Sequence, residues 1–265
     1  MTTLSTPAIV LHRAAYGDFD LILTLYTLES GKLTAIAKSA KKSIRRFAGA
    51  LEPFSLLNVV LREGKGMPVL QEAGLTEPFG KIREAILKTA YAAYWAEIVK
   101  NWSEEGHEQA SVFNLLVTVL RALDGRISGE EVLSIFFQVH FLKLAGLLPN
   151  IHICRVCHLD LEKIKTDTVI FHIAKGGIIC DRCHRAESRI DSISKGSLKQ
   201  LKWIEKSDLP KALRVRFSPL NLKESRDLLE GFISHHLGRR FQSLRVLRQI
   251  RCEEKDAPKK DSEDT

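Results

Sequence analysis

The sequence predicts an α+β protein with more than one domain, and three observations support this prediction. Residues 1–80 contain short apolar stretches between turn residues, which are typical of strands. From residue 81 onwards the apolar residues recur with helical spacing. Four cysteines in two CxxC pairs interrupt this helical region. We therefore expect a β-domain over residues 1–80 and an α-helical domain over residues 81–252, with an inserted cysteine module at residues 151–186.

The β-domain is expected to be a five-stranded barrel. Turn residues such as Gly17-Asp18 and Glu63-Gly-Lys-Gly66 separate the apolar stretches. The strands are predicted at residues 7–14, 21–28, 32–38, 53–62 and 67–71. Five short strands in this length favour an OB-fold, which is the commonest five-stranded barrel. The pattern alone leaves other small barrels, such as an SH3-like one, open.

Helical spacing of apolar residues defines the second domain. Helices are predicted at residues 81–102, 109–123, 130–148, 194–205, 223–237 and 239–250. The helix at residues 130–148 is apolar on every side, which is typical of a buried helix. We expect its larger side chains to lie in the core, namely Phe136, Phe137, Phe141 and Leu144. Residues 253–265 are charged and lack apolar anchors, so a disordered tail is expected there.

The two CxxC pairs are the strongest local signal. They consist of Cys154, Cys157, Cys180 and Cys183. Two such pairs can place four thiolates around one ion, which is the signature of a structural Zn²⁺ site. A hairpin with strands at residues 167–173 and 178–179 is expected between the pairs. Four sulfur ligands leave no coordination position for a water nucleophile, so we expect one structural zinc ion and no metal catalysis.

Four histidines lie close to the cysteines in the sequence and could serve as further ligands. They are His152, His158, His172 and His184. Surface positions are the more common outcome for such residues, so we expect them outside the metal site. A fifth cysteine, Cys252, stands alone, and this usage suits a reducing compartment better than a disulfide framework. No apolar run approaches the length of a spanning helix, so we expect a cytoplasmic, nucleoid-associated protein without a membrane segment.

Charge is distributed unevenly in this chain of formal net charge +8. Residues 151–252 contain twenty-one Lys/Arg against eleven Asp/Glu. A second concentration lies between Glu29 and Glu52, where six basic residues occur without an acidic one. These six are Lys32, Lys38, Lys41, Lys42, Arg45 and Arg46. Such clusters attract polyanions, so we expect the loop after the third strand to bind nucleic-acid phosphates. A solvated loop without a ligand is the alternative.

A second basic feature is predicted on the helix at residues 194–205. Lys195, Lys199, Lys202 and Lys206 are spaced by four, three and four residues, which places them on one side of a helix. Trp203 could stack on a base there, although a core position is more common for Trp. Arg239 and Arg240 extend the positive charge towards the C-terminus. An ordinary charged helix face remains open as the alternative.

Sequence motifs of common enzyme classes do not occur in the chain. It has no GxxxxGK[ST], no GxGxxG after a strand, no HExxH and no GxSxG. Basic clusters without a catalytic motif favour a nucleic-acid-binding protein over an enzyme. An RNA- or ribosome-associated OB-fold zinc protein fits the same composition, and a metal-dependent nuclease is disfavoured because a carboxylate cluster is missing.

Several segments, taken in order, resemble the RecO family of bacterial recombination mediators. The opening segments are Ile9-Val-Leu-His-Arg13, Gly17-Asp-Phe-Asp20, Leu25-Tyr-Thr-Leu-Glu-Ser-Gly31, Lys38-Ser-Ala-Lys-Lys42 and Leu51-Glu-Pro-Phe54. The later ones are Phe141-Leu-Lys-Leu-Ala-Gly-Leu-Leu-Pro149 before Cys154 and His236-Leu-Gly-Arg239 through Ser243-Leu-Arg245. The resemblance covers residues 5–250. No single motif is unique to the family, but their succession is specific.

This resemblance implies a non-enzymatic mediator of DNA repair and homologous recombination in the RecF pathway. Such a protein binds single- and double-stranded DNA, anneals complementary strands and helps RecR load RecA. Partners would include RecR and the single-strand DNA-binding protein. The family's DNA contacts map onto Arg13, Lys38, Lys41, Lys42, Arg45 and Arg46, and its zinc ligands map onto the four cysteines, which some members lack. His140 and Lys143 are candidates for binding the acidic, Phe-ended tail of the single-strand DNA-binding protein.

Overall fold

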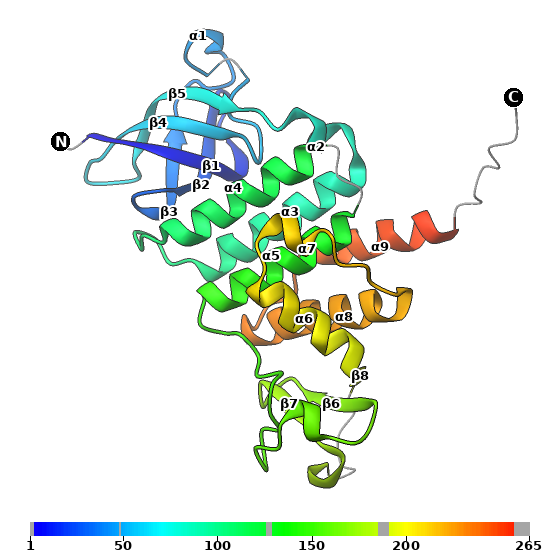
Figure 1. Ribbon diagram of the computed structural model, residues 1–265. Coiled ribbons are helices and arrows are strands. Elements are labelled where there is room, and N and C mark those ends of the chain that lie inside the picture. The colour runs from blue at the N-terminus through cyan, green and yellow to red at the C-terminus, as the bar shows by residue number, and fades with distance from the viewer. Residues whose placement is uncertain (1–2, 48, 126–128, 185–190, 257–265) are drawn as a thin grey trace, which may run out of the picture. The chain divides into compact units, whose positions relative to one another are not determined.

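The structure is a computed structural model that describes residues 3–47, 49–125, 129–184 and 191–256 (Figure 1). Contacts within the chain divide it into two compact units. Unit 1 comprises residues 1–126 together with 241–265, and unit 2 comprises residues 127–240. The predicted division into domains at residues 1–80 and 81–252 stays a prediction. The two units are described separately below.

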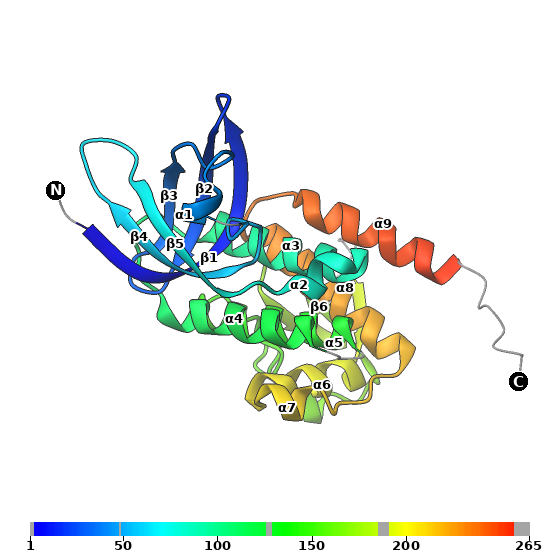
Figure 2. The same cartoon turned by 90° about the horizontal axis from the view of Figure 1, so that it is seen from above.

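Unit 1 begins with a closed five-stranded barrel, as the sequence predicted. Its strands are β1 (Thr3–Tyr16), β2 (Asp20–Thr27), β3 (Gly31–Ala37), β4 (Leu56–Arg62) and β5 (Val69–Glu77). Their order around the barrel is β1-β2-β3-β5-β4, and β1 closes it by pairing with β4. All neighbours are antiparallel except β3 and β5, which meet in parallel at Ile36 and Val69. This five-stranded arrangement is the OB-fold. Figure 2 shows the β1–β2 hairpin projecting from the barrel.

Period-two alternation builds the core of the barrel. Leu23 and Leu25 on β2 and Leu57, Val59 and Leu61 on β4 are fully buried, because alternate residues of a strand point to the same face. Full burial of a side chain of this size contributes about 1.5–3 kcal/mol each. The barrel is thus held by its own apolar interior and can present its loops to ligands.

The turn between β2 and β3 depends on Gly31. Its φ of +60° is in the left-handed region, and a Cβ there would lie 1.9 Å from the carbonyl oxygen of His107. No side chain fits in that space, so glycine is required for the segment after α3 (Ile86–Trp102) to approach the barrel. Gly31 and Lys32 form β-bridges with Glu105 at this contact.

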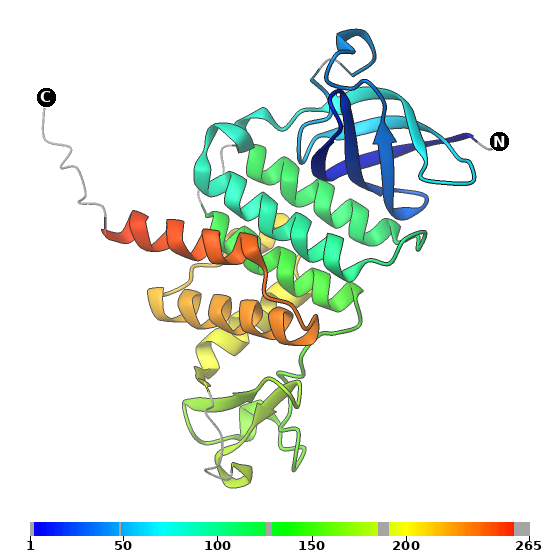
Figure 3. The same cartoon turned by 180° about the vertical axis from the view of Figure 1, so that it is seen from behind.

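Helices of unit 1 follow the barrel and return at the C-terminus. Besides α3 they are α1 (Ile44–Phe47), α2 (Gly80–Glu84), α4 (Ala110–Asp124) and α9 (Gln242–Asp256). The single helix predicted at residues 81–102 is wrong in one respect, because Ala85 is extended and separates α2 from α3. The Glu97 carboxylate of α3 accepts hydrogen bonds from the backbone N–H groups of Gln242 and Ser243, at 3.2 and 2.9 Å. It thereby caps α9, which packs along α3 (Figure 3).

The described residues of unit 2 form four α-helices and the cysteine module. The helices are α5 (Glu130–Leu144), α6 (Lys195–Lys206), α7 (Leu209–Ala212) and α8 (Pro219–His236). Next to the module, β8 (Asp191–Ser194) pairs with β6 (Thr168–His172). The module itself contains β6 and β7 (Gly177–Ile179), which form the predicted hairpin. Two short 3-10 helices, η1 (Leu161–Lys163) and η2 (Asp181–Cys183), complete it.

The apolar helix α5 differs from its prediction at the C-terminal end. It stops at Leu144 instead of Leu148, because the chain turns at Gly146 with a φ of +69°. Phe136, Phe137 and Phe141 are buried, as expected. The expectation for Leu144 is wrong, since its position in the last turn leaves it 41% exposed. At the other end of the chain α9 extends to Asp256, and residues 257–265 of the predicted tail lie outside the described residues.

Candidate metal centre and nucleic-acid interface

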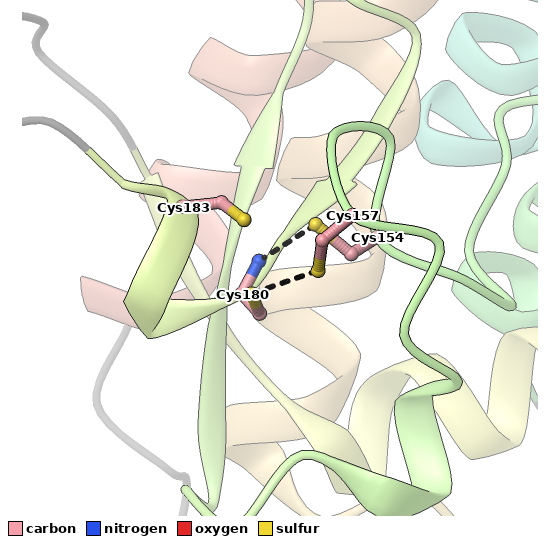
Figure 4. Close-up of side chains that lie close together, drawn as sticks. All are labelled: Cys154, Cys157, Cys180 and Cys183. Carbon is pink, nitrogen blue, oxygen red and sulfur yellow. Dashed lines mark hydrogen bonds between the residues drawn. The ribbon is translucent and has the colours of Figure 1, made fainter.

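The four cysteines meet at one point of the cysteine module (Figure 4). Cys154 and Cys157 come from the loop after α5, and Cys180 and Cys183 come from the segment after β7. All four sulfur atoms lie within 4.8 Å of one another, and those of Cys157 and Cys180 are 3.6 Å apart. A tetrahedral ion with sulfur ligands at about 2.3 Å separates those sulfurs by roughly 3.8 Å. The cluster could therefore hold one metal ion.

Tight turns in the backbone bring each pair of cysteines together. The N–H of Cys183 donates to the carbonyl of Cys180 at 3.0 Å, and the N–H of His158 donates to the carbonyl of Cys154, also at 3.0 Å. His158 has a φ of +58°, which turns the chain back after the first pair. The backbone N–H groups of Val156 and Cys180 point at the Cys154 sulfur, at 3.5 and 3.4 Å. These donors stabilise negative charge on that sulfur.

The thiols differ in their readiness to ionise. Burial raises the pKa of Cys154, but backbone N–H groups of Cys157 and its neighbours outweigh this and lower the pKa to about 6. Burial raises the pKa of Cys180, and the sulfurs of Cys157 and Cys180 raise the pKa of Cys183. Once Cys154 has lost its proton, deprotonation of Cys180 or Cys183 beside it is therefore unfavourable. A bound divalent cation removes that penalty, because a coordinating thiol loses its proton.

The histidines near the cysteines are not part of this cluster among the described residues. His152 places its Nε2 3.3 Å from a carboxylate oxygen of Glu205 on α6. His172 accepts a hydrogen bond from the backbone N–H of Lys175 through its Nδ1 at 3.2 Å. These contacts agree with the expectation that the histidines lie outside the ligand set.

Contacts within unit 2 hold the cysteine module against α6 and α8. The rings of Phe171 on β6 and Phe232 on α8 meet edge to face, with centroids 5.7 Å apart. The ammonium of Lys195 donates to the carbonyl of Ile164. Gly177 lets the backbone approach closely, because a Cβ there would lie 2.4 Å from the carbonyl oxygen of Asn150. The position of the module on α6 is therefore fixed by packing as well as by the cysteines.

The N-terminal basic cluster follows β3, as expected, in a turn that leads into the short helix α1, and we call residues 38–46 the basic loop. Its described cations contact neutral groups. Lys41 donates to the carbonyl oxygens of Gly17 and Asp18 at 3.2 and 3.3 Å. Lys42 lies 3.4 Å above the ring centroid of Phe19. Arg46 donates to the carbonyl of Lys38 at 2.8 Å and to the Ser43 hydroxyl at 3.1 Å. Lys38 is exposed, and the side chain of Arg45 lies outside the described residues.

Two other predicted DNA-binding residues of the barrel have structural partners. Arg13 forms an ion pair of 2.6 Å with Glu52, on the wall of a cavity of about 390 Å³ that Lys41 also lines. Lys32 is half-buried and donates to the carbonyl of Lys100 at the end of α3, at 3.1 Å. The structure therefore brings Arg13 and Lys41 together and separates Lys32 from the basic loop's exposed cations.

The lysines of α6 occupy one side of the helix, and we call Lys195, Lys199, Lys202 and Lys206 the lysine face. Lys199 and Lys202 share the carboxylate of Glu162 from η1, at 3.1 and 3.9 Å. Lys206 is exposed. Trp203 is 57% exposed and thus outside the core, where Trp is more commonly found. Ser194, directly before Lys195, caps the helix by accepting a hydrogen bond from the N–H of Ser197 at 3.2 Å.

The remaining predicted residues are placed as follows. Arg239 and Arg240 are exposed after α8. His140 contacts the ring of Phe136, with centroids 4.2 Å apart, and its Nε2 lies 3.1 Å from the carbonyl of Ile204. Burial lowers the pKa of His140, so its ring is neutral at pH 7. Lys143 donates to the carbonyl of Glu205 at 3.3 Å. Their role in binding a partner stays a prediction.

Sequence reasoning missed three side chains beside these surfaces. Tyr16 and Phe19 flank the tip of the β1–β2 hairpin and are 54% and 43% exposed. Aromatic residues on both sides of the Gly17-Asp18 turn were the available signal, because a hairpin tip exposes its flanks. Glu162 had no such signal, since only the folded chain places it next to α6.

In the described part of the chain, no helix is long and apolar enough to cross a membrane.

Comparison with known proteins gives matches along almost the whole chain. The family described as "Recombination protein O N terminal" matches residues 1–79, and "Recombination protein O C terminal" matches residues 83–245. The chain is 44% identical to a DNA repair protein RecO of Desulfosudis oleivorans, over 95% of this chain and 99% of that protein. It is 41% identical to one of Desulfatibacillum aliphaticivorans, over 95% and 98%, and 34% identical to one of Syntrophus aciditrophicus, over 94% and 96%. The chain therefore belongs to the RecO family of DNA repair proteins.

Proposed function

We propose that this RecO-family protein is a recombination mediator of the RecF pathway that binds single- and double-stranded DNA and anneals complementary strands. The observation that carries this proposal is the chemistry of the basic loop. Lys41, Lys42 and Arg46 are held by carbonyl oxygens, a hydroxyl and an aromatic ring, all of which are neutral. Their positive charge is therefore available to phosphates, which bind such residues without regard to sequence.

Annealing follows from this charge without a chemical step. Two complementary strands repel each other through their phosphates, and lysine and arginine side chains reduce that repulsion. Base stacking and pairing then supply the driving force. Arg13 joins the same site if a phosphate replaces Glu52 as its partner. The proposal requires no catalytic residue, so we propose a mediator that is not an enzyme.

The metal that we propose for the cysteine cluster is a single structural Zn²⁺. Four thiolates suit zinc because it accepts sulfur ligands in a tetrahedral arrangement. Its ligands would be Cys154, Cys157, Cys180 and Cys183, with backbone N–H groups supporting the charge of Cys154. Bound there, zinc would fix the fold of the cysteine module and the position of Glu162 beside α6.

We further propose that RecR and the single-strand DNA-binding protein are partners and that the protein helps to load RecA. These partners are what the resemblance to the RecO family implies. A cytoplasmic, nucleoid-associated location belongs to the same proposal. The relevant test is affinity for purified RecR and for the acidic tail of the single-strand DNA-binding protein, with H140A and K143A as variants. Unchanged tail affinity in both variants would remove those two residues from the proposal.

The DNA-binding proposal is tested by fluorescence anisotropy on a labelled single-stranded oligonucleotide, titrated with salt, with annealing of its complement followed in parallel. The proposal predicts tight binding that weakens steeply with salt, and accelerated annealing. Absence of binding at moderate salt would contradict it. An RNA of equal length serves as the second ligand. A clear preference for RNA would favour an RNA- or ribosome-associated role instead.

A further inference from the structure

The exposed side of α6 carries an aromatic residue that packing does not explain. Trp203 is 57% exposed, while Leu198, Leu201 and Ile204 on the opposite side of the helix are buried. Among the described residues no hydrogen bond and no ring contact involves the indole of Trp203; the Ser207 hydroxyl donates to its backbone carbonyl at 2.8 Å. The indole is therefore free to contact a ligand.

Lysines flank this indole on the same side of the helix. Lys199 precedes Trp203 by four residues and Lys206 follows it by three, so the three side chains share one face. Both lysines are exposed. The surrounding segment, residues 195–216, contains seven Lys/Arg against two Asp/Glu. Cations that track a backbone beside an aromatic ring are the recurring arrangement of single-strand binding sites.

The partner of Lys199 shows how an anion binds here. Glu162 of the cysteine module places its carboxylate 3.1 Å from the Lys199 ammonium, and both side chains are more than half exposed. Ion pairs of this kind at a surface are weak, so another anion can replace the carboxylate. A phosphate carries the same charge and presents oxygen acceptors in the same way.

We propose that this side of α6 is a separate single-strand binding site, in which a base stacks on Trp203 and the adjoining phosphates contact Lys199 and Lys206. A phosphate replaces the Glu162 carboxylate when the strand binds. An exposed ring on a helix surface offers a face for stacking, whereas an apolar peptide side chain needs a concave pocket. The proposal rests on the DNA-binding function proposed above and adds a site outside the barrel.

Intrinsic fluorescence tests this site directly, because the chain has three tryptophans. Trp95 is fully buried and Trp102 is half-buried, so Trp203 is the most exposed of the three. The probe is an oligothymidylate added to the full-length, zinc-loaded protein. We expect quenching of the emission in the wild type and in W102F, and its loss in W203F.

An affinity measurement separates stacking from charge. In a K41E/K42E background, where the basic loop is weakened, W203A should reduce oligothymidylate affinity roughly fivefold or more. W203F should retain most of the affinity, because a phenyl ring also stacks. The matched control is L220A, since Leu220 is a similarly exposed apolar residue of unit 2, at 60%. Affinity in L220A should equal that of the K41E/K42E parent.

Three outcomes would overturn the inference. If labelled oligothymidylate binds but neither quenches Trp203 nor depends on it, the site is wrong while the proposed function stands. If an acidic peptide ending in Phe quenches Trp203 and the oligonucleotide does not, this face binds a protein. If the wild type binds no oligonucleotide at moderate salt, the inference and the proposed function fail together.

Discussion

The basic loop of the barrel and the lysine face of α6 carry similar charge but hold it differently. In the basic loop, Lys41 and Arg46 contact carbonyl oxygens and a hydroxyl. On the lysine face, Lys199 and Lys202 share the carboxylate of Glu162. A neutral partner orients a cation without reducing its positive charge, whereas a carboxylate offsets part of that charge.

Because of this difference, we expect the two surfaces to contribute unequally to DNA binding. Among the described residues the cations of the basic loop have no ion-pair partner, so this surface should supply most of the salt-dependent binding. The lysine face must first give up an ion pair, but it adds Trp203 as a stacking surface. The lysine face also depends on the cysteine module for its Glu162, while the barrel has its own core.

Metal removal should produce the largest difference between the two surfaces. Structural zinc sites of this type contribute roughly 10–16 kcal/mol of apparent binding energy at pH 7. Chelation, or the C180S substitution of a buried residue among the proposed ligands, should therefore unfold the cysteine module and leave the barrel folded. Amide hydrogen exchange measures this, with loss of protection expected in β6–β8 and retained protection in β1–β5.

The matched control for metal loss is C252S, because Cys252 is exposed and outside the cluster. One metal ion per chain is expected in the wild type and in C252S, by elemental analysis. Oligonucleotide affinity of the stripped protein should stay within a fewfold of the wild type. Complete loss of binding on chelation would show that the barrel does not act independently of the module.

Charge reversal in the basic loop should produce the next largest effect. We expect K41E/K42E to weaken single-strand binding by roughly tenfold to hundredfold at about 100 mM salt, because two phosphate contacts become repulsive. Anisotropy titration measures this. K81E/R83E is the control, since it changes the charge of unit 1 equally at exposed residues of α2. An equal loss in both variants would mean that net charge, and not the loop, determines binding.

Glu224 on α8 accepts hydrogen bonds from two serines at the N-terminal end of α6, and this contact should make the stability of unit 2 depend on pH. Burial opposes ionisation of Glu224, but hydrogen bonds from Ser197 and Ser194 outweigh it and lower the pKa of this carboxyl below its ordinary 4.5. Its contribution is therefore present above pH 4.5 and is lost as the pH falls towards the lowered pKa. We expect E224Q to cost roughly 1 kcal/mol at pH 7 and progressively less in acid. Urea denaturation at several pH values measures this.

The smallest effect is expected for E162Q. Removing the carboxylate frees Lys199 and Lys202 for phosphate, and exposed ion pairs are worth up to about 1 kcal/mol, so affinity should rise by no more than roughly fivefold. The corresponding control is D160N, which changes an exposed acid of the same module that instead caps η1. Weaker binding in E162Q would show that the carboxylate positions the lysines rather than competing for them.

The sequence predicted those elements that are encoded by the spacing of residues close together in the chain. Short apolar stretches between turn residues indicated all five barrel strands, although β5 runs to Glu77 instead of the predicted residue 71. Spacing alone predicted the cysteine cluster, because two CxxC pairs are the usual ligand pattern of a structural metal site. The period of four, three and four residues also placed the lysine face on one side of α6.

Contacts between distant segments could not be predicted in this way. Glu162 neutralises lysines that lie about forty positions further along the chain, and no local pattern encodes that pairing. The same holds for Glu97, which caps α9 across more than half of the sequence. The break at Ala85 was missed because the apolar spacing continues through it.

The salt dependence of single-strand binding tests most directly whether the basic loop contributes more to DNA binding than the lysine face does. Each phosphate contact contributes about 0.7 to the slope of log K against log salt concentration. We expect K41Q/K42Q to lower the magnitude of this slope by roughly 1.4, and K199Q/K206Q to lower it by about half as much, because Glu162 already neutralises Lys199. An equal or larger change in K199Q/K206Q would contradict the unequal roles of the two surfaces.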